Sequence, residues 1–242
     1  MPPRALKPVG VALVDKPAGP SSFALVAALR RRTRARTGHA GTLDPFATGL
    51  LLLLSGAATR LAPCFVGLDK RYVTDIDLRS TTTTGDPEGE TLEQHEPPAL
   101  NELDDALAAL RGEVELPIPA ASAVKIDGER AYKLARRGVT VEMPLRRSTV
   151  HELELVERAA DGATVRIALH VTSGTYVRAI AQALGGHCTS LRRTAIGPFE
   201  LTEAETVEAV ELQPVAAVLE RLPPEALARV PDPIRSGVLA LA

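Results

Sequence analysis

A segment of twelve residues, Gly38 to Gly49 (GHAGTLDPFATG), combines three glycines with a histidine and an Asp-Pro pair. Glycine permits a positive φ and lets the backbone approach a ligand closely. Loops held by a rigid scaffold often supply functional residues. This segment is therefore suited to holding the Asp44 carboxylate and the His39 imidazole at the edge of a cleft, where they could act on a bound substrate.

Interpretations without a functional role stay open for both residues. Asp44 can cap a helical turn that has Pro45 at its first position, which is a common arrangement at helix starts. His39 can be a loop histidine whose hydrogen bonds are satisfied locally. The segment alone does not decide between these interpretations and a functional site.

Aromatic residues are scarce, with no Trp, four Phe and three Tyr. Tyr72 directly follows two cations, Tyr176 comes two residues before Arg178, and Tyr132 lies beside Lys133. A ring next to cationic groups can stack on a nucleobase while the cations hold phosphates. We interpret Tyr72 and Tyr176 in this way, and Tyr132 as a side chain that packs on a helix face.

Three further arginines have positions with chemical consequences. Arg178 lies near the start of an expected helix, where it could pair with a buried carboxylate. Arg192 and Arg193 are adjacent on an expected strand, so their side chains should point to opposite faces. At least one of these two should therefore reach solvent or RNA.

The formal net charge of −2 is unevenly distributed along the chain. Residues 1–84 contain 12 Lys and Arg against 5 Asp and Glu, and residues 116–199 contain 12 against 7. The remaining stretches are acidic, so a nearly neutral protein can present a basic surface. Five arginines lie between Arg30 and Arg36, and Arg suits bidentate binding of phosphate. A solvated helix end with a bias toward Arg explains the same cluster.

Turn signals and hydrophobic periodicity predict the elements that position these residues. We expect a buried strand over 9–15, then a helix over 23–32 and a loop over 33–42. Residues 72–78 alternate strictly, which predicts a half-exposed strand. The other expected elements are helices over 101–110, 128–137 (stopped by Gly138) and 175–184, and strands over 147–156, 164–172 and 191–199. Because no regular βαβ rhythm is present, we expect an α+β fold with a mixed, largely antiparallel sheet and flanking helices.

Five segments, in order, resemble the motifs of one family of RNA-modifying enzymes. They are Asp15 to Gly19 (DKPAG), Gly38 to Gly49, Lys70 to Tyr72 (KRY), Ser122 to Lys125 (SAVK) with Gly128 and Tyr132, and Gly174 to Arg178 (GTYVR) with Leu191 to Thr194 (LRRT). The corresponding family motifs include KPxG, GHxGTLDPxATG, KxY and SAxK. Over about residues 9–199 the chain thus resembles the bacterial TruB-type tRNA pseudouridine synthases, which isomerise uridine 55 in the T arm of tRNA.

The resemblance implies the pseudouridine synthase fold and a role for each matching residue. Asp44 would be the nucleophile, Arg178 would pair with it, and Tyr72 would stack on the flipped uracil and is a candidate for removing its C5 proton. The implied substrate-binding residues are His39 at the T loop, and Tyr72, Tyr176 and Leu191 around the base. Rejoining the base through C5 needs a nucleophile, a pocket for an extruded base and a group that takes a proton. We expect neither a metal nor an organic cofactor, because the reaction involves no redox change or hydrolysis.

The chain departs from the family pattern at two places. Thr81 to Thr84 stand where the family usually has Thr-Asp-Thr, so an acidic residue is missing there. About forty acidic, proline-interrupted residues follow Phe199, where family members generally have an RNA-binding domain of the PUA type. We therefore expect a catalytic domain over 1–200 and a short, weakly organised extension over 201–242, with the PUA-like domain absent or vestigial. Weaker tRNA binding around an intact chemical centre should follow.

Composition excludes several classes of protein. With 45% hydrophobic and 24% charged residues, the chain is neither disordered nor collagen-like. The longest aliphatic run, Leu50 to Leu54, is too short for a membrane span, and the N-terminus lacks the pattern of a signal peptide. Cys64 and Cys188 lack metal or redox spacing, so we expect small buried residues. We therefore expect a cytoplasmic protein.

Alternative functions remain. The chain could be a tRNA-binding and tRNA-refolding protein of the same fold, or a pseudouridine synthase that acts on another RNA. A hydrolase using Asp44 and His39 would need a further base or metal ligand, for which the sequence has no convincing spacing. We expect the T arm of tRNA as partner, no guide RNA, no membrane association, and a monomer.

Overall fold

The computed structural model describes residues 8–122, 124–126, 128–137, 139 and 141–231. By contacts the chain forms two compact units, the first from Met1–Arg71 with Arg192–Ala242 and the second from Tyr72–Leu191. The divisions between the units, after Arg71 and after Leu191, fall within the sequence ranges of β4 (Lys70–Asp77) and β12 (His187–Ile196). The sequence predicted a division into 1–200 and 201–242 from the resemblance to a family, and that division stays a prediction.

The first unit is built around strand β3 (Thr48–Ser55), which pairs antiparallel with β1 (Gly10–Lys16) and with β2 (Thr37–His39) and parallel with β12. Its other elements are α1 (Ser22–Thr33), the 3-10 helix η1 (Gly56–Leu61), α2 (Ala62–Val66), β13 (Phe199–Glu200), the 3-10 helix η2 (Leu201–Glu203), α6 (Val215–Leu219) and α7 (Pro224–Leu227).

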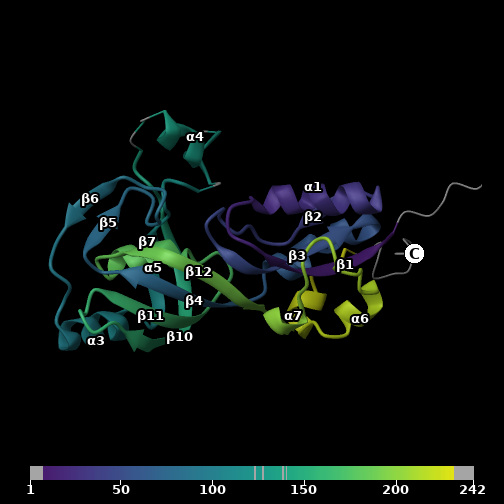
Figure 1. Ribbon diagram of the computed structural model, residues 1–242. Coiled ribbons are helices and arrows are strands. Elements are labelled where there is room, and N and C mark those ends of the chain that lie inside the picture. Colours follow the sequence, from purple (N-terminus) through teal and green to yellow (C-terminus); the bar gives the residue numbers. More distant parts are fainter. Residues whose placement is uncertain (1–7, 123, 127, 138, 140, 232–242) are drawn as a thin grey trace, which may run out of the picture. The chain divides into compact units, whose positions relative to one another are not determined.

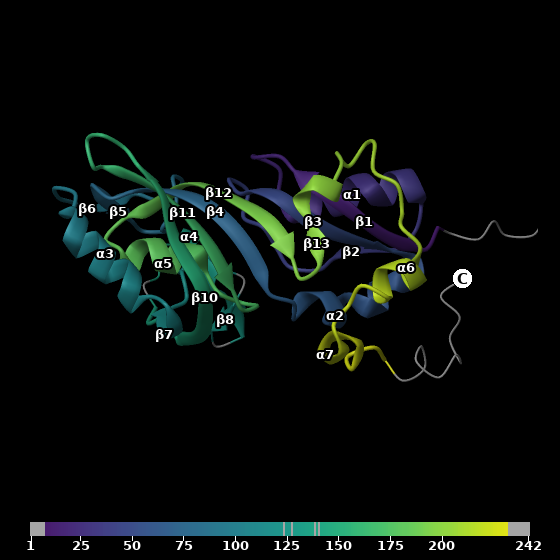
Figure 2. The same cartoon turned by 90° about the horizontal axis from the view of Figure 1, so that it is seen from below.

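Leu50 to Leu54 form a strand that is buried on both faces, as an uninterrupted aliphatic run indicates. Leu51 and Leu53 pack with the inner side of α1, and the alternate leucines pack with α2, α6 and α7. Figures 1 and 2 show α1 on one face of these strands and α2, α6 and α7 on the other. The sheet of the first unit is therefore covered on both sides.

Apolar side chains between residues 200 and 231 belong to the core of the first unit. Glu205 and Gln213 exchange backbone hydrogen bonds with β1, so this segment lies along the outer edge of that strand. Val218 and Ala226 are buried in the same core as the sheet. The weak organisation that we expected from the proline density is therefore wrong for residues 201–231, because apolar side chains between the prolines reach the sheet. No separate C-terminal domain occurs within the described ranges.

The second unit contains strands in the order β12–β4–β11–β10–β7 and two small antiparallel pairs, β5–β6 and β8–β9. Its elements are β5 (Ser80–Thr82), β6 (Thr91–Gln94), α3 (Leu100–Ala109), β7 (Gly112–Pro117), β8 (Lys125–Ile126), β9 (Glu129–Arg130), α4 (Ala131–Arg136), β10 (Leu145–Arg158), β11 (Thr164–Val171) and α5 (Val177–Ala183).

The predicted mixed, largely antiparallel α+β fold is confirmed, since β12 is parallel to β3 while β7, β10 and β11 pair antiparallel. The alternation over 72–78 is also confirmed, because Tyr72, Thr74 and Ile76 are buried. The loop expected over 33–42 is partly wrong, because β2 pairs with β3 within it. Strand β12 begins at His187, four residues before the expected start.

Several smaller expectations have clear outcomes. Cys64 and Cys188 are free and buried, as predicted. The helix expected over 128–137 is divided into β9 and α4. Gly138, which was expected to end it, and Ala123 lie outside the described residues, as does the side chain of Tyr132. Throughout the described ranges, no helix is long and apolar enough to cross a membrane.

Candidate active site

Asp44 lies in the first unit, in the segment that joins β2 to β3. The hydroxyl of Ser22, at the first residue of α1, donates to the Leu43 carbonyl at 2.9 Å and accepts from the Leu43 N–H at 2.8 Å. Ser22 is buried, so water does not compete for these bonds. No helix begins at Asp44, but the Ala47 N–H donates to the Asp44 carbonyl at 3.2 Å, so Pro45 follows Asp44 in a turn and the capping interpretation stays open. One hydroxyl group thus fixes the backbone directly before the carboxylate.

The backbone after Asp44 is fixed by Lys16, whose side chain is completely buried. Its ammonium donates to the carbonyl oxygens of Ala47 at 2.6 Å, Pro45 at 3.0 Å and Pro17 at 3.0 Å. Desolvation lowers the pKa of Lys16 to about 8, and the charge of Asp44 opposes that shift. The Lys16 ammonium, through these three hydrogen bonds, thus joins the Lys-Pro turn to the segment that contains Asp44.

A second buried cation, Arg193, lies under the glycine-rich segment. Its guanidinium donates to the Leu50 carbonyl at 2.7 Å and to the Gly41 carbonyl at 3.2 Å. Gly49 has φ +100°, and a Cβ there would lie 2.3 Å from the Arg193 carbonyl oxygen. The glycine is therefore required both by its φ and by the close approach of β12.

Arg192 and Arg193 point to opposite faces, as predicted. The Arg192 side chain is 43% exposed and forms an ion pair with Asp15 at 2.8 Å, whereas Arg193 is buried. Because the two residues are neighbours on one strand, this difference follows from the alternation of a pleated strand.

His39 ends β2 and is half-buried. Desolvation lowers the pKa of its imidazole, and the charge of Arg193 lowers it further. The ring is therefore neutral at pH 7. Its Nδ1 atom is buried and has no hydrogen-bond partner among the described residues. The interpretation of His39 as a locally satisfied histidine is thus not supported at this nitrogen.

In the second unit, Arg178 lies in α5 and is held by two main-chain carbonyls and one carboxylate. Its guanidinium donates to Thr84 O at 2.6 Å and to Ala121 O at 2.9 Å. Asp86 Oδ2 lies 3.2 Å away, and the two side chains are only 3% and 6% exposed. The sequence predicted a buried carboxylate for Arg178, and Asp86 meets that description.

Asp86 is the partner of Arg178 that sequence reasoning missed. Its other oxygen, Oδ1, accepts from the Thr84 hydroxyl at 2.5 Å and from the Glu88 N–H at 3.0 Å. Gly85 has φ +71° and packs against Arg178, so the turn before Asp86 fits closely on α5. The signal in the sequence was an acid two residues after the four threonines, separated from them by Gly85.

The remaining predicted residues lie in the second unit with Arg178. Tyr72 is 8% exposed on β4, Leu191 is 7% exposed on β12, and Tyr176 is half-buried immediately before α5. Asp44 and His39 belong to the first unit. The structure therefore fixes the surroundings of each group within its own unit, and the predicted pairing of Asp44 with Arg178 stays a prediction.

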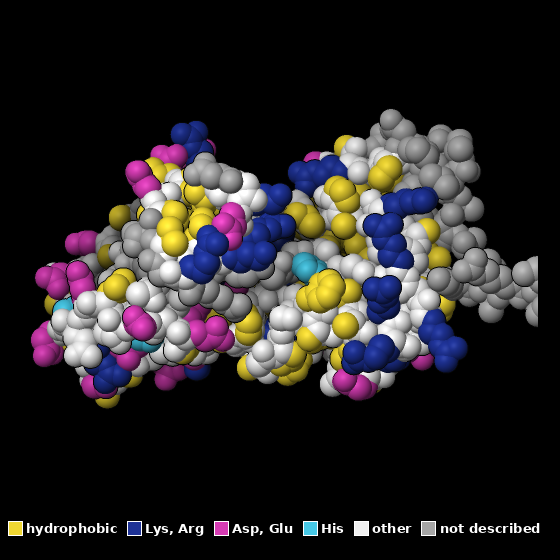
Figure 3. Space-filling model, turned by 90° about the horizontal axis from the view of Figure 1, so that it is seen from above, with side chains coloured by type: hydrophobic (Ala, Val, Ile, Leu, Met, Phe, Trp, Pro, Cys, Tyr) yellow, Lys and Arg dark blue, Asp and Glu magenta, His cyan; other side chains and the backbone are white. Residues whose placement is uncertain are grey.

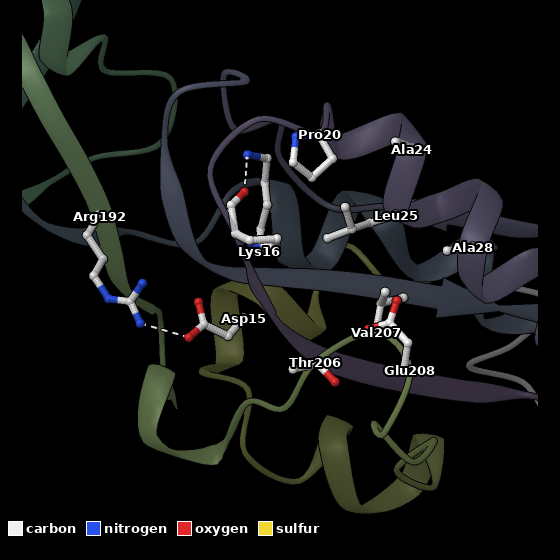
Figure 4. Close-up of a pocket in the computed structure, with 11 residues that line it drawn as sticks. Asp15, Lys16, Pro20, Ala24, Leu25, Ala28, Arg192, Thr206, Val207 and Glu208 are labelled. Atoms are coloured by element: carbon white, nitrogen blue, oxygen red, sulfur yellow. Dashed lines mark hydrogen bonds and ion pairs between the residues drawn. The ribbon is translucent and has the colours of Figure 1, made fainter.

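The first unit also contains a cavity of about 410 Å³ beside α1 (Figure 4). Its walls are mostly apolar, and the polar groups at its edge include the Asp15–Arg192 ion pair. The lining residues are Asp15, Lys16, Pro17, Pro20, Ala24, Leu25, Ala28, Arg192, Thr206, Val207 and Glu208. None of the predicted site residues lines it, so it lies outside the predicted catalytic set.

Two histidines of the second unit lie close together beside a glutamate. The rings of His151 on β10 and His170 on β11 lie 4.8 Å apart between centroids, and His170 Nδ1 lies 3.8 Å from Glu152 Oε1. A register shift in β10 between Val150 and Glu152 turns both His151 and Glu152 outward. None of these residues belongs to the predicted catalytic set.

Comparison with known proteins gives a family model described as TruB family pseudouridylate synthase (N terminal domain), which matches residues 30–177. The chain is 44% identical over 222 residues to tRNA pseudouridine synthase B of Corynebacterium jeikeium (strain K411), covering 85% of this chain and 72% of the relative. It is 43% identical over 224 residues to tRNA pseudouridine synthase B of Leifsonia xyli, covering 87% and 74%.

Among solved structures, the chain is similar to one in a Cbf5-Nop10-Gar1 complex, with a TM-score of 0.60 and 28% identity. This match covers 79% of the present chain and 50% of that chain. A second match, from an archaeal box H/ACA sRNP Nop10-Cbf5 complex, has a TM-score of 0.59 and 25% identity and covers 82% and 51%. The present chain thus spans about half the length of these solved chains.

Proposed function

Because the chain belongs to the TruB family of pseudouridylate synthases and matches tRNA pseudouridine synthases over most of its length, we propose that it isomerises uridine 55 in the T arm of tRNA, with Asp44 as nucleophile. The observation that best supports this role is the fixed backbone on both sides of Asp44, held by Ser22 and Lys16. A nucleophile must be held in an attack-ready geometry, and such bonds supply part of the required order.

The reaction is balanced without a co-reactant. The glycosidic bond from C1′ to N1 breaks, a bond from C1′ to C5 forms, the proton leaves C5, and N1 of the rotated uracil carries a proton in the product. We assign to Asp44 the transient covalent bond to the substrate, and to Tyr72 the stacking on the flipped uracil and the removal of the C5 proton.

Arg178 is our proposed partner for Asp44. Its guanidinium is already buried and held by carbonyls and by Asp86, so little further order is lost when it binds another carboxylate. Tyr176 and Leu191 are proposed to line the base pocket. His39, with its neutral and half-exposed ring, is proposed to contact the T loop.

We further propose that the enzyme works as a cytoplasmic monomer without a guide RNA. The bacterial relatives are named tRNA pseudouridine synthase B, which supports a tRNA substrate and the absence of a guide RNA. The solved chains from the H/ACA complexes are more distant in sequence.

The test is to incubate the purified chain with an unmodified tRNA transcript and to map pseudouridine by carbodiimide-stop primer extension. We expect one stop at position 55, lost with Asp44→Asn and with a transcript in which uridine 55 is replaced by cytidine. Asp105→Asn, an exposed acid on α3, is the matched control and should retain the stop. Binding of tRNA without any stop would favour the tRNA-refolding alternative, and a stop elsewhere would overturn the site preference.

A further inference from the structure

Helix α1 exposes a face that none of the proposed catalytic roles uses. With 3.6 residues per turn, Phe23, Ala27, Arg30 and Arg31 lie within an arc of about 100°. The opposite side of the helix is buried in the first unit's core. Arg34 caps the same helix, and we call these five residues the α1 face.

Phe23 supplies an aromatic ring in a fixed position at one end of the α1 face. The ring is 70% exposed, which is the largest exposure among the bulky apolar residues that the structure describes. The start of the helix is rigid, because Ser21 Oγ accepts from the Ala24 N–H at 3.2 Å and Ser22 is bonded to Leu43. A fixed, exposed ring is a platform on which an unpaired base can stack.

Three arginines form the other end of the α1 face. Arg30, Arg31 and Arg34 are all exposed, and within the described ranges none has a carboxylate at ion-pair distance. Arg32 differs, because it turns to the other side and donates to the main-chain carbonyls of Val207 and Val210. The structure therefore uses Arg32 internally and leaves its neighbours available for an external anion.

The spacing of these groups suits a nucleic-acid strand. At a rise of 1.5 Å per residue, Arg30 lies about 10 Å and Arg34 about 16 Å along the helix from Phe23. A planar guanidinium binds phosphate bidentately, and a stacking ring followed by cations is the usual arrangement for binding unpaired nucleotides. Figure 3, which looks onto the side where α1 lies, shows Lys and Arg side chains gathered over the first unit.

We propose that the α1 face is a second RNA-contact surface, where Phe23 stacks on an unpaired base of the tRNA and Arg30, Arg31 and Arg34 bind phosphates of the same strand. The inference rests on the proposed function for the identity of the RNA. A row of unpaired cations favours a polyanion over an apolar protein segment. The contact contributes to affinity and leaves the chemistry at Asp44 unchanged.

The test measures binding of unmodified tRNA to the full chain by filter binding at several salt concentrations. Arg30→Gln/Arg31→Gln should weaken binding and reduce the slope of log K against log[salt] by about 1.4 to 1.8, since each phosphate contact contributes about 0.7 to 0.9. Phe23→Ala should weaken binding about 5- to 100-fold with an unchanged slope, because stacking releases no counterions. In turnover assays both variants should raise KM and leave kcat within about twofold.

Two matched variants serve as controls. Arg229→Gln removes an exposed cation next to α7, which packs on the face of the first unit's sheet opposite α1. Leu100→Ala removes an apolar side chain that is 53% exposed at the start of another helix, α3. Neither control should change the affinity or the salt slope.

Unchanged affinity and slope in both α1-face variants would overturn the inference and favour a protein partner for this face. Binding of tRNA can be measured without turnover, so the α1-face inference and the proposed function can be overturned separately. Loss of affinity in the variants without any pseudouridine formation by the wild type would overturn the proposed function alone. Pseudouridine formation with unaltered binding by the variants would overturn the inference alone.

Discussion

The carboxylate of Asp86 and the guanidinium of Arg178 form a buried ion pair in the second unit, 3.2 Å apart, with side chains 6% and 3% exposed. Asp86 also accepts from Thr84 and from the Glu88 N–H, so its position is fixed by its own turn. A buried arginine needs such compensation, because an unpaired charge in the interior is strongly destabilising. Asp86 is therefore a positioning residue for Arg178.

Asp86→Asn should lower the rate of pseudouridine formation at least tenfold while changing the tRNA affinity less than threefold. Removing one partner of a buried pair costs about 3–5 kcal/mol of stability, and the shape of asparagine should limit the loss to the lower part of that range. Single-turnover rates and urea unfolding would measure the two effects.

The surface pair of Asp77 with Arg79 is the matched control for that variant. The Arg79 side chain is 56% exposed, so Asp77→Asn should cost less than about 1 kcal/mol and leave the rate unchanged. If Asp86→Asn behaved like Asp77→Asn, the positioning role would have to be abandoned.

Local sequence was sufficient to identify the segment around Asp44 and strands β1, β4, β10, β11 and β12, whereas β2, β3 and β7 were not predicted. Glycine spacing, strict alternation over 72–78 and the adjacent Arg192 and Arg193 each correspond to a geometric requirement of the backbone. The pairing of Asp86 with Arg178 could not be predicted in the same way, because the two residues are far apart in the chain. The packing of the Gly85 turn on α5 and the hydrogen bonds from Arg178 and Gln182 to that segment bring them together.

The C-terminal residues show a second limit of sequence reasoning. Proline density after Gln213 indicated weak organisation, yet the segment bonds to the edge of β1 and buries Val218 and Ala226 in the first unit. Proline shortens helices but does not prevent apolar side chains from packing. Whether such a segment joins a core depends on the free edge of β1, which its own sequence does not reveal.

Gly49→Ala should be more destabilising than Gly19→Ala, although both glycines have φ +100°. The backbone strain is shared and costs about 1–3 kcal/mol. At Gly49 the new Cβ would also lie 2.3 Å from the Arg193 carbonyl oxygen, whereas at Gly19 nothing lies within 4 Å. Comparing the thermal or urea unfolding of the two variants isolates the loss of stability that comes from the steric clash at position 49. Equal losses would show that β12 moves away from β3 without cost.

Lys16→Met should become more costly as the pH rises. The pKa of Lys16 is about 8 in the folded protein against 10.5 for an exposed lysine, because burial removes water from the ammonium. Between these values the unfolded chain binds more protons, so this group makes the folded state more stable as the pH increases. The Lys16→Met variant lacks this pH-dependent gain in stability. Its loss of unfolding free energy relative to the wild type should therefore be smallest below pH 8 and should grow toward pH 10.

Urea unfolding at pH 7, 8.5 and 10 would measure this trend. Lys133→Met, an exposed residue on α4, is the control, and it should change stability by less than about 0.5 kcal/mol at each pH. A deficit for Lys16→Met that is constant with pH would mean that the buried amine does not lose its proton in this range.

Arg193→Met should raise the pKa of His39 toward 6.5 without fully restoring it. Desolvation is the main cause of the low pKa of His39 and stays in place, whereas the charge of Arg193 is the second cause and is removed. Arg193→Lys keeps the charge and should leave the pKa of His39 low, which separates electrostatics from packing. NMR titration of the imidazole, assigned with His39→Gln, measures the shift in each protein.

The protonation state of His39 should affect the affinity for tRNA. If a neutral His39 binds the T loop, tRNA affinity of Arg193→Met should fall relative to Arg193→Lys as the pH is lowered from 7.5 to 6, because the ring gains a proton earlier. The loss of the Arg193 charge by itself should weaken the attraction to RNA by the same amount at both pH values. An identical pH dependence in the two variants would show that the charge state of His39 has no part in holding the RNA.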